Sequence, residues 1–222
     1  MMDIPATTRH GLLFLNGEIA PEALEDLDRR GISTILAADG GFHHAMHLGF
    51  IPDVVVGDFD SIAPAERDSH PGIEWLHRPD QDMNDFEKAL IAAEERGITH
   101  LTVLGIAGGR LDHTLTNLSV VARFDRKIHL DIRHGRARIF PVRGSWEFRG
   151  EPGQLLSLAP LGEAVGVHTR GLRYPLKGET LAPGIREGLS NVIEDGEVSI
   201  SLKSGLLLVF LFPPESRESS PA

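Results

Sequence analysis

The chain has 222 residues, of which 41% are hydrophobic and 24% charged, as in ordinary soluble globular proteins. This length suits one large domain or two small ones and is enough to bury a real core. The formal net charge of −10 argues against nucleic acid as a partner, because DNA and RNA binding needs a basic surface. The absence of cysteine excludes disulfides, thiol catalysis and thiolate metal sites.

Targeting signals are not apparent in the sequence. The amino-terminal residues lack the basic and then apolar pattern of a signal peptide. No apolar run approaches the ~20 residues that are needed to span a bilayer. We therefore expect a soluble, cytoplasmic protein with no membrane partner.

In the first part of the chain, short apolar runs alternate with helical patterns. Strands are expected at 11–16, 34–38, 53–56, 73–76 and 101–104, and helices at 21–30, 41–48, 86–96 and 111–124. This alternation predicts a parallel, Rossmann-like sheet that is covered by helices on both faces. In such sheets, ligands bind beyond the carboxyl ends of the strands, and the polar motifs described below all follow predicted strands.

Beyond about residue 133 the helical periodicity fades, and short apolar runs are separated by Gly and Pro. Strands are expected at 138–140, 145–148, 155–158, 165–168, 198–202 and 206–212, the last two as a hairpin around a turn at 203–205. This pattern predicts a smaller all-β domain, sandwich or barrel, of which we adopt the sandwich. The predicted domains are an α/β catalytic domain over 1–135, the β domain over 136–213 and a disordered tail over 214–222.

Aspartates gather in two short runs of the α/β region. Asp58 and Asp60 follow the strand at 53–56, while Asp80, Asp82 and Asp85 precede or open the helix at 86–96. Carboxylates that are packed together repel each other unless a cation neutralises them. Mg²⁺ prefers hard oxygen ligands, usually one or two carboxylates together with substrate phosphates. The two runs therefore predict a magnesium site that receives a polyphosphate.

Both runs also have a simpler interpretation. A pair such as Asp58 and Asp60 can be two solvated acids in a loop, although the neighbouring Gly and Ser favour close approach by a ligand. The acids at 80–85 can serve as helix caps, since negative charge is favoured at a helix N-terminus and Asn84 is a good N-cap residue. Three acids together with Gln81 exceed what capping needs, so we favour a functional role for this run.

Two glycine-containing turns complete the candidate site. The tripeptide Asp39-Gly40-Gly41 ends a strand and opens a helix, which by itself is most simply a structural turn. The loop at 105–109 leads into a helix whose N-terminus can hold anionic oxygens, although it is neither a Walker A nor a Rossmann fingerprint. Arg110 offers a fork of donors for phosphate, Asp112 can bind metal or hold Arg110, and His113 can donate to phosphate.

Taken together and in order, the motifs resemble the thiamine pyrophosphokinase family over roughly residues 11–212. The matching motifs are Ala38-Asp39-Gly40-Gly41, Pro52-Asp53, Gly57-Asp58-Phe59-Asp60-Ser61-Ile62, Asp80-Gln81-Asp82 to Asp85 with Lys88-Ala89-Leu90, Gly108-Gly109-Arg110-Leu111-Asp112-His113, Gly171-Leu172-Arg173-Tyr174-Pro175-Leu176 and Gly188-Leu189-Ser190-Asn191. Each motif is weak alone, but the ordered set is specific. Two positions depart from the bacterial pattern. Gln81 stands where Lys is frequent, and Asn84 stands where Thr is usual but keeps an oxygen that can cap the helix.

The resemblance implies an α/β catalytic domain, a β domain that helps to bind thiamine, and a homodimer whose sites are shared between subunits. It implies transfer of the pyrophosphoryl group of ATP to the hydroxyl of thiamine, which gives thiamine diphosphate and AMP. The implied catalytic residues are Asp39, Asp58, Asp60, Asp82, Asp85, Arg110 and Asp112, with Mg²⁺ on Asp58, Asp60 and Asp85. The implied ATP-binding residues are Gly40, Gly41, Ser61, Gln81, Asn84, Lys88, Gly108, Gly109, Arg110 and His113, and Ser190 and Asn191 would bind thiamine. The choice of general base among Asp39, Asp82 and Asp112 stays open.

Three rival functions fit parts of the same pattern. One is a pyrophosphokinase that acts on a pterin alcohol. Another is a metal-dependent phosphohydrolase with Asp58 as nucleophile, which would release inorganic phosphate instead of AMP. The third is a non-catalytic nucleotide-binding regulator, which would bind ATP without turnover.

Overall fold

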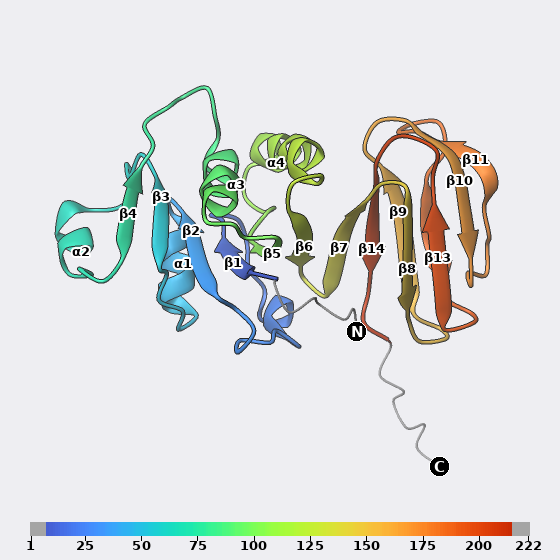
Figure 1. Ribbon diagram of the computed structural model, residues 1–222, viewed down its shortest axis with the longest axis horizontal. Coiled ribbons are helices and arrows are strands. Elements are labelled where there is room, and N and C mark those ends of the chain that lie inside the picture. Colours follow the sequence, from blue (N-terminus) through green and yellow to red (C-terminus); the bar gives the residue numbers. More distant parts are fainter. Residues whose placement is uncertain (1–7, 215–222) are drawn as a thin grey trace, which may run out of the picture. The chain divides into compact units, whose positions relative to one another are not determined.

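The structure, a computed structural model, describes residues 8–214, so the tail predicted over 214–222 lies, except for residue 214, outside the described residues. The chain divides after Gly135 into two compact units, an α/β unit and a β unit, whose elements are labelled in Figure 1. Among the described residues, no helix is long and apolar enough to cross a membrane.

The α/β unit contains a parallel sheet with the strand order β6-β5-β1-β2-β3-β4. Its strands are β1 (His10–Phe14), β2 (Thr34–Ala38), β3 (Val54–Gly57), β4 (Glu74–His77), β5 (His100–Leu104) and β6 (His129–His134). Each neighbouring pair is parallel, so all carboxyl ends lie at one edge. The strand order reverses between β1 and β5, which is where open α/β sheets bind their ligands.

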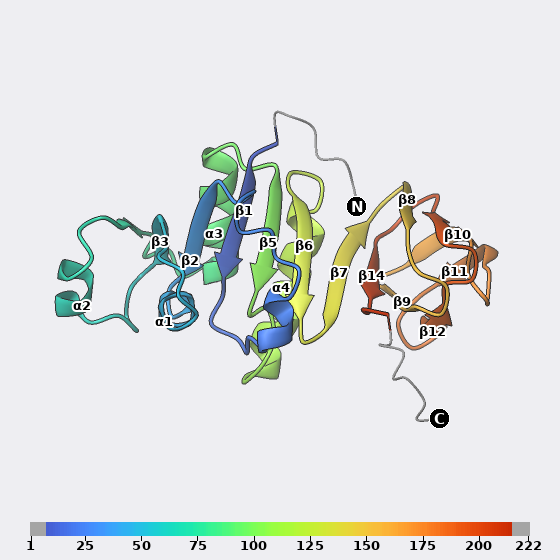
Figure 2. The same ribbon diagram turned by 90° about the horizontal axis from the view of Figure 1, so that it is seen from below.

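Helices cover both faces of this sheet, as predicted. The helices are α1 (Gly41–His47), α2 (Pro64–Asp68), α3 (Asp85–Glu95) and α4 (Leu111–Phe124), with a short 3₁₀ helix η1 (Pro21–Leu24). Phe42 and Ala45 of α1 pack against Phe14 and Val55 on one face, while α3 and α4 cover the other face (Figure 2). Because both faces are covered, β3 is buried throughout and β1 is buried after His10, so both appear in the sequence as apolar runs.

The helix predicted over 21–30 is wrong beyond its first turn. Only η1 is helical, and Asp26 has a left-handed φ of 58°. The buried guanidinium of Arg133 on β6 donates hydrogen bonds to the carbonyls of Ala23 and Glu25, at 3.3 and 2.9 Å. These carbonyls therefore have a partner other than the N–H groups of a continuing helix. A partner 110 residues away from Ala23 leaves no trace in the local pattern.

The β unit is a sandwich of two antiparallel sheets, with strand orders β12-β9-β14-β7 and β11-β10-β13-β8. Its strands are β7 (Ala137–Val142), β8 (Ser145–Arg149), β9 (Leu155–Pro160), β10 (Ala164–Arg170), β11 (Lys177–Leu181), β12 (Gly188–Val192), β13 (Glu197–Ser201) and β14 (Leu207–Leu211). Leu158 and Val209 from the first sheet and Val167 and Ile200 from the second share one core. The predicted fold class, an α/β sheet domain followed by a smaller β sandwich, is confirmed.

The hairpin predicted at the end of the β unit is wrong. Strand β13 pairs with β10 and β8, whereas β14 pairs with β7 and β9 in the other sheet. The turn at 203–205 therefore crosses between the sheets, and Ile200 and Val209 pack in the core that the sheets share. Apolar residues alternate in the same way in a hairpin and in such a crossover, so the pattern does not separate them. The sequence also did not predict α2, β6, or the edge strands β11 and β12, which bury few residues.

Candidate active site

Three aspartates lie together at the carboxyl ends of β2 and β3. Asp39 follows β2, Asp58 and Asp60 follow β3, and one carboxylate oxygen from each lies within 4.8 Å of the others. Between the last two, Phe59 has a left-handed φ of 64° and a buried ring that packs edge-on against Trp75, with 5.7 Å between ring centroids. The convergence of Asp58 and Asp60 therefore comes from a turn of the backbone around a buried ring.

Asp39 is the most deeply buried member of this group, with 7% of its surface exposed. Its Oδ2 accepts a hydrogen bond of 2.6 Å from the hydroxyl of Ser61. Its Oδ1 is buried and has no hydrogen-bond partner among the described residues. Asp39 also has a left-handed φ of 41°. Unpartnered buried carboxylate oxygens and left-handed non-glycine residues both cost free energy, and such costs are concentrated at functional sites.

Asp58 is held by its neighbours in a charged form. One oxygen accepts from the backbone N–H of Asp60 at 3.3 Å and the other from the amide of Gln81 at 3.2 Å. Burial raises the pKa of Asp58, but the two hydrogen bonds and the positive charge of Lys88 outweigh it and bring the pKa below its ordinary value. Gln81, predicted to bind ATP, thus also orients a carboxylate of the acid group.

Asp85 opens α3 beside the group, but the three carboxylates that converge are those of Asp39, Asp58 and Asp60. Burial raises the pKa of Asp85, the charges of Asp39 and Asp58 raise it further, and the ammonium of Lys88 opposes them. That ammonium lies 3.3 Å from Asp85 Oδ1, and Lys88 is only 3% exposed. The predicted ATP ligand Lys88 is therefore an internal counter-ion of Asp85 in this structure.

The predicted cap of α3 is confirmed. The side-chain oxygen of Asn84 accepts a hydrogen bond of 2.9 Å from the N–H of Glu87. Asp80 does not cap the helix, because its carboxylate accepts from the N–H of Asp82 within the preceding loop, at 2.8 Å. Asp82 is exposed and follows Gln81, whose amide donates to Asp58 of the acid group.

The glycines after β2 are explained by packing within the chain. A Cβ on Gly41 would lie 2.2 Å from the carbonyl oxygen of Phe14, and a Cβ on Gly40 would lie 2.6 Å from the side chain of Asn16. No side chain fits where this turn meets the end of β1. This close contact accounts for Gly40 and Gly41 without a ligand.

The loop after β5 presents polar groups at the start of α4. Gly108 and Gly109 have φ values of 111° and 68°, which favour glycine. Arg110 makes a two-point ion pair with Asp112, at 3.1 Å from Nε and 2.5 Å from Nη2. This hydrogen-bonded pair lowers the pKa of Asp112 to about 2. Of the two roles foreseen for Asp112, the structure therefore has the one in which it holds Arg110, and His113 is exposed beside it.

In the β unit, the predicted thiamine residues occupy β12. Ser190 has a left-handed φ of 56°, and its N–H donates to the hydroxyl of Ser157 at 2.9 Å. The carboxamide of Asn191 is buried, and both of its polar atoms are hydrogen-bonded: its oxygen accepts from the N–H groups of Tyr174 and Val192, and its nitrogen donates to the carbonyl of Tyr174. Asn191 thus fixes the backbone of Tyr174, whose side chain is 64% exposed.

The structure adds Tyr174 as a candidate site residue, which the sequence prediction did not name although it lies within a motif that carried the family resemblance. Its signals were its identity as the only tyrosine of the chain and its place in a Gly- and Pro-containing turn. An exposed aromatic ring on a rigidly held backbone, next to a strained polar residue, is suited to bind a flat ligand ring.

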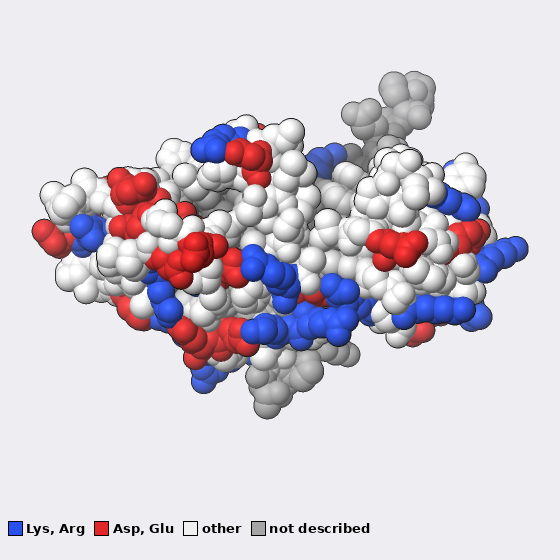
Figure 3. Space-filling model, turned by 90° about the horizontal axis from the view of Figure 1, so that it is seen from above, with Lys and Arg blue, Asp and Glu red and all other residues white. Residues whose placement is uncertain are grey.

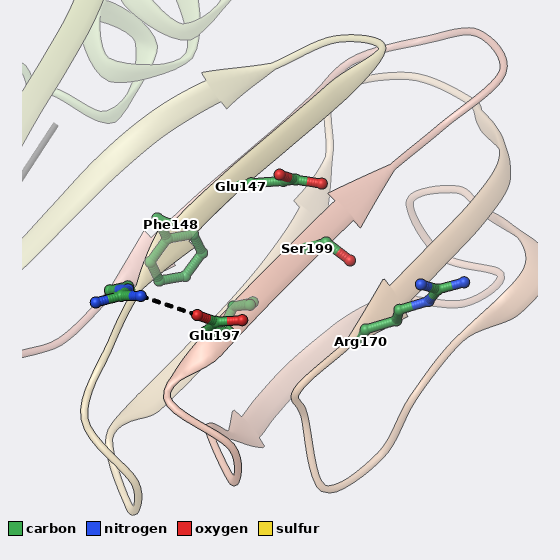
Figure 4. Close-up of a pocket in the computed structure, with 7 residues that line it drawn as sticks. Glu147, Phe148, Arg170, Glu197 and Ser199 are labelled. Atoms are coloured by element: carbon green, nitrogen blue, oxygen red, sulfur yellow. Dashed lines mark hydrogen bonds and ion pairs between the residues drawn. The ribbon is translucent and has the colours of Figure 1, made fainter. Parts of the chain in front are cut away.

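The cavity in Figure 4 is a different feature. It has a volume of about 580 Å³, lies on β8, β10 and β13, and contains the exposed ion pair between Arg149 and Glu197 at 3.0 Å. None of the predicted site residues lines it. On the face shown in Figure 3, acidic side chains gather over the α/β unit, in keeping with the net charge of −10.

Comparisons with known proteins agree with the fold and the motifs. The family model described as "Thiamin pyrophosphokinase, catalytic domain" matches residues 30–132, and that described as "Thiamin pyrophosphokinase, vitamin B1 binding domain" matches residues 147–207. Thiamine pyrophosphokinase 1 of Oryza sativa subsp. japonica is 30% identical over 177 residues, which cover 73% of this chain and 67% of that protein. Thiamine pyrophosphokinase of Bacillus subtilis (strain 168) is 27% identical over 183 residues, covering 78% and 85%.

Solved structures share the fold at lower identity. The crystal structure of thiamine pyrophosphokinase from Bacillus subtilis aligns with a TM-score of 0.79 and 21% identity, over 92% of this chain and 99% of that one. The yeast thiamin pyrophosphokinase aligns with a TM-score of 0.75 and 17% identity, over 93% and 87%. These structures show the shared fold, whereas the two family models and the relative from Oryza sativa show the family. The chain belongs to the thiamine pyrophosphokinase family.

Proposed function

We propose that the chain is a thiamine diphosphokinase, which transfers the pyrophosphoryl group of ATP to the hydroxyl of thiamine. The observation that carries the proposal is the acid group of Asp39, Asp58 and Asp60 at the carboxyl edge of the sheet, in a chain of this family. The position of the acid group supports a polyphosphate substrate, because ligands of open α/β sheets bind at this edge.

The reaction needs positioning and charge neutralisation more than covalent catalysis. The thiamine oxygen forms a bond to the β-phosphorus of ATP while the bond from that phosphorus to the α,β-bridging oxygen breaks. AMP leaves with the bridging oxygen, and the hydroxyl proton passes to a carboxylate at the site or to water. Arg110, with exposed N–H groups at the start of α4, is placed to donate to phosphate oxygens.

The acid group has the donor chemistry that Mg²⁺ requires. Asp39, Asp58 and Asp60 offer hard carboxylate oxygens. The Oδ1 atom of Asp39 accepts no hydrogen bond from any described residue, so it can bind an ion. We propose that these three residues hold the ion, with Asp85 beside them. When bound, Mg²⁺ would neutralise charge on the transferring phosphates. Ser61, Gln81 and Lys88 then act by orienting Asp39, Asp58 and Asp85, respectively.

For the thiamine side, the candidate residues are neutral. Ser190 offers a hydroxyl, and the ring of Tyr174 offers a flat apolar surface for a heteroaromatic ring. Asn191 contributes to this surface indirectly, because its carboxamide is hydrogen-bonded to the backbone of Tyr174 and so holds in place the backbone that carries the ring.

We also propose that the protein is a homodimer with sites shared between subunits, as the family resemblance implies. Leu111 and Leu115 on α4 support this proposal, since they are 71% and 59% exposed next to the Arg110 loop. Exposed apolar side chains beside a site are the kind that an interface covers. Light scattering on the purified protein will give twice the monomer mass if the proposal is right, and a single monomer mass refutes it.

One assay separates the proposed function from its rivals. Formation of AMP from MgATP is measured with thiamine, thiamine monophosphate or a pterin alcohol as the acceptor. Of the three acceptors, we expect only thiamine to give AMP. AMP that forms only with the pterin alcohol would support the other pyrophosphokinase, inorganic phosphate without AMP would support the phosphohydrolase, and ATP binding without any product would support the regulator.

A further inference from the structure

Two asparagine side chains form a hydrogen-bonded bridge between the segments that flank the candidate active site. The Nδ2 group of Asn84 donates to Oδ1 of Asn117 at 3.0 Å, and Nδ2 of Asn117 donates to the carbonyl of Ile106 at 2.9 Å. Asn84 immediately precedes α3, Asn117 lies in the middle of α4, and Ile106 belongs to the loop after β5. The bridge therefore joins three elements of the α/β unit.

Each amide in the bridge has its orientation determined by its partners. The oxygen of Asn84 accepts the N–H of Glu87 as the cap of α3, so only its nitrogen can face Asn117. The oxygen of Asn117 accepts that nitrogen, and its own nitrogen faces a carbonyl, which only accepts. The chain of donors runs in one direction and leaves no alternative assignment of the two amides.

The ends of the bridge coincide with the two halves of the proposed phosphate site. Asn84 adjoins Asp85 at the start of α3, next to the acid group. Ile106 is buried and precedes the glycines that lead to Arg110. One half offers carboxylates for the metal, and the other offers N–H donors for phosphate. A single bound MgATP contacts both halves only if the spacing between them is held.

We infer that Asn117 is a positioning residue that sets the acidic start of α3 against the phosphate loop after β5, and so tunes the site for MgATP. This inference rests on the proposed function for its substrate, but the bridge itself is a property of the α/β unit. Asn117 was not among the residues that the sequence indicated, because its role depends on partners 33 and 11 residues away in the chain.

The test is Asn117→Ala. We expect the KM for ATP to rise and kcat to fall, by about 10- to 100-fold in kcat/KM for ATP, because small misplacements of binding groups have effects of this size. The KM for thiamine is expected to stay unchanged. A variant that is only less well folded would lower kcat through a smaller active fraction and would leave both KM values unchanged, which would overturn the inference.

A second variant guards against a folding defect, because Asn117→Ala leaves the buried carbonyl of Ile106 without its donor. Asn84→Ser keeps an N-cap oxygen but removes the nitrogen that reaches Asn117, while the bond to Ile106 is retained. It should raise the KM for ATP in the same direction, and the double variant should be no worse than the poorer single variant. Additive effects would mean that the two residues act independently and would overturn the inference.

The matched control is Ser119→Ala, which removes a polar side chain of α4 whose one hydrogen-bond partner within residues 8–214 is the carbonyl of Leu115 in the same helix. It should leave both KM values unchanged.

The affinity for a non-hydrolysable ATP analogue with Mg²⁺, measured by calorimetry, provides a readout that does not depend on thiamine. If the parent chain binds the analogue but forms no AMP, the proposed function fails. The inference then stands if Asn117→Ala weakens analogue binding and falls if it does not.

Discussion

In the α/β unit the candidate site contains a group of charged carboxylates, two of which accept side-chain hydrogen bonds, whereas in the β unit the predicted ligand residues Ser190 and Asn191 are neutral. Asp39 and Asp58 accept hydrogen bonds from Ser61 and Gln81. In the β unit, the side chain of Tyr174 is exposed, and its backbone is hydrogen-bonded to Asn191, the neighbour of Ser190. This difference is the one expected if the first unit receives polyphosphate and the second a flat organic ring.

The two regions have one feature in common, which is backbone strain. Among the described residues, four non-glycine residues have left-handed φ values, and three of them belong to the candidate sites: Asp39, Phe59 and Ser190. Left-handed conformations at non-glycine residues persist where the surrounding structure over-determines them. Strain therefore marks both candidate regions, although their chemistry differs. We expect the two regions to respond separately to mutation.

The largest expected effect is on the acid group of the α/β unit. In Asp60→Ala, AMP formation from ATP and thiamine should fall by at least about 100- to 1000-fold, the usual result of removing one group that stabilises transition-state charge. The circular dichroism spectrum should be unchanged, because Asp60 is exposed. The matched control is Asp80→Ala, which removes an exposed acid whose carboxylate accepts, in the described part of the chain, a single hydrogen bond from the N–H of Asp82. Unchanged turnover in Asp60→Ala would remove this residue from the proposed metal site.

An intermediate effect is expected for the candidate thiamine residues of the β unit. Tyr174→Ala should raise the KM for thiamine by about 10-fold, in line with the loss of one stacking surface, and should leave the KM for ATP as it was. Tyr174→Phe keeps the ring and should resemble the parent. A Tyr174→Ala variant in which the KM for ATP rises and that for thiamine does not would contradict the division of roles between the units.

The smallest effect is expected for the ion pair between Arg110 and Asp112. The pKa of Asp112 is lowered to about 2, below its unfolded value near 3.8. The contribution of this pair to stability is therefore complete above that unfolded value and is lost as the pH falls towards 2. Because the pair is fully exposed, Asp112→Asn should leave the Tm between pH 5 and 8 unchanged within error. A clear fall in Tm at pH 7 would show that the pair has a structural role that its exposure does not suggest.

Much of the α/β unit could be predicted because its signals are local. The strands β1, β2, β3 and β5 are short apolar runs, α3 and α4 have helical periodicity, and Asn84 caps the helix that follows it. The failures come from distant partners. Arg133 binds carbonyls of the segment that was expected to continue as a helix, and the turn at 203–205 joins two sheets where a hairpin was expected.

The site divides in the same way. Its acidic residues were identified by their positions after strands, and three of them do converge. The choice of Asp39 in place of Asp85 in that group was not visible in the sequence, because it depends on how β2 and β3 lie side by side. Nor did the sequence show that Lys88 forms an ion pair with Asp85, or that Asn191 is hydrogen-bonded to the backbone of Tyr174.

By itself, the sequence determined the fold class, the family and the identity of the charged residues, because apolar periodicity and ordered motifs are properties of neighbouring residues. Only the tertiary structure decided which polar groups meet. A hydrogen bond or ion pair depends on angstrom-scale distances between side chains that are remote in the chain. The bridge from Asn84 through Asn117 to Ile106 is of this kind, and so is the unpartnered oxygen of Asp39.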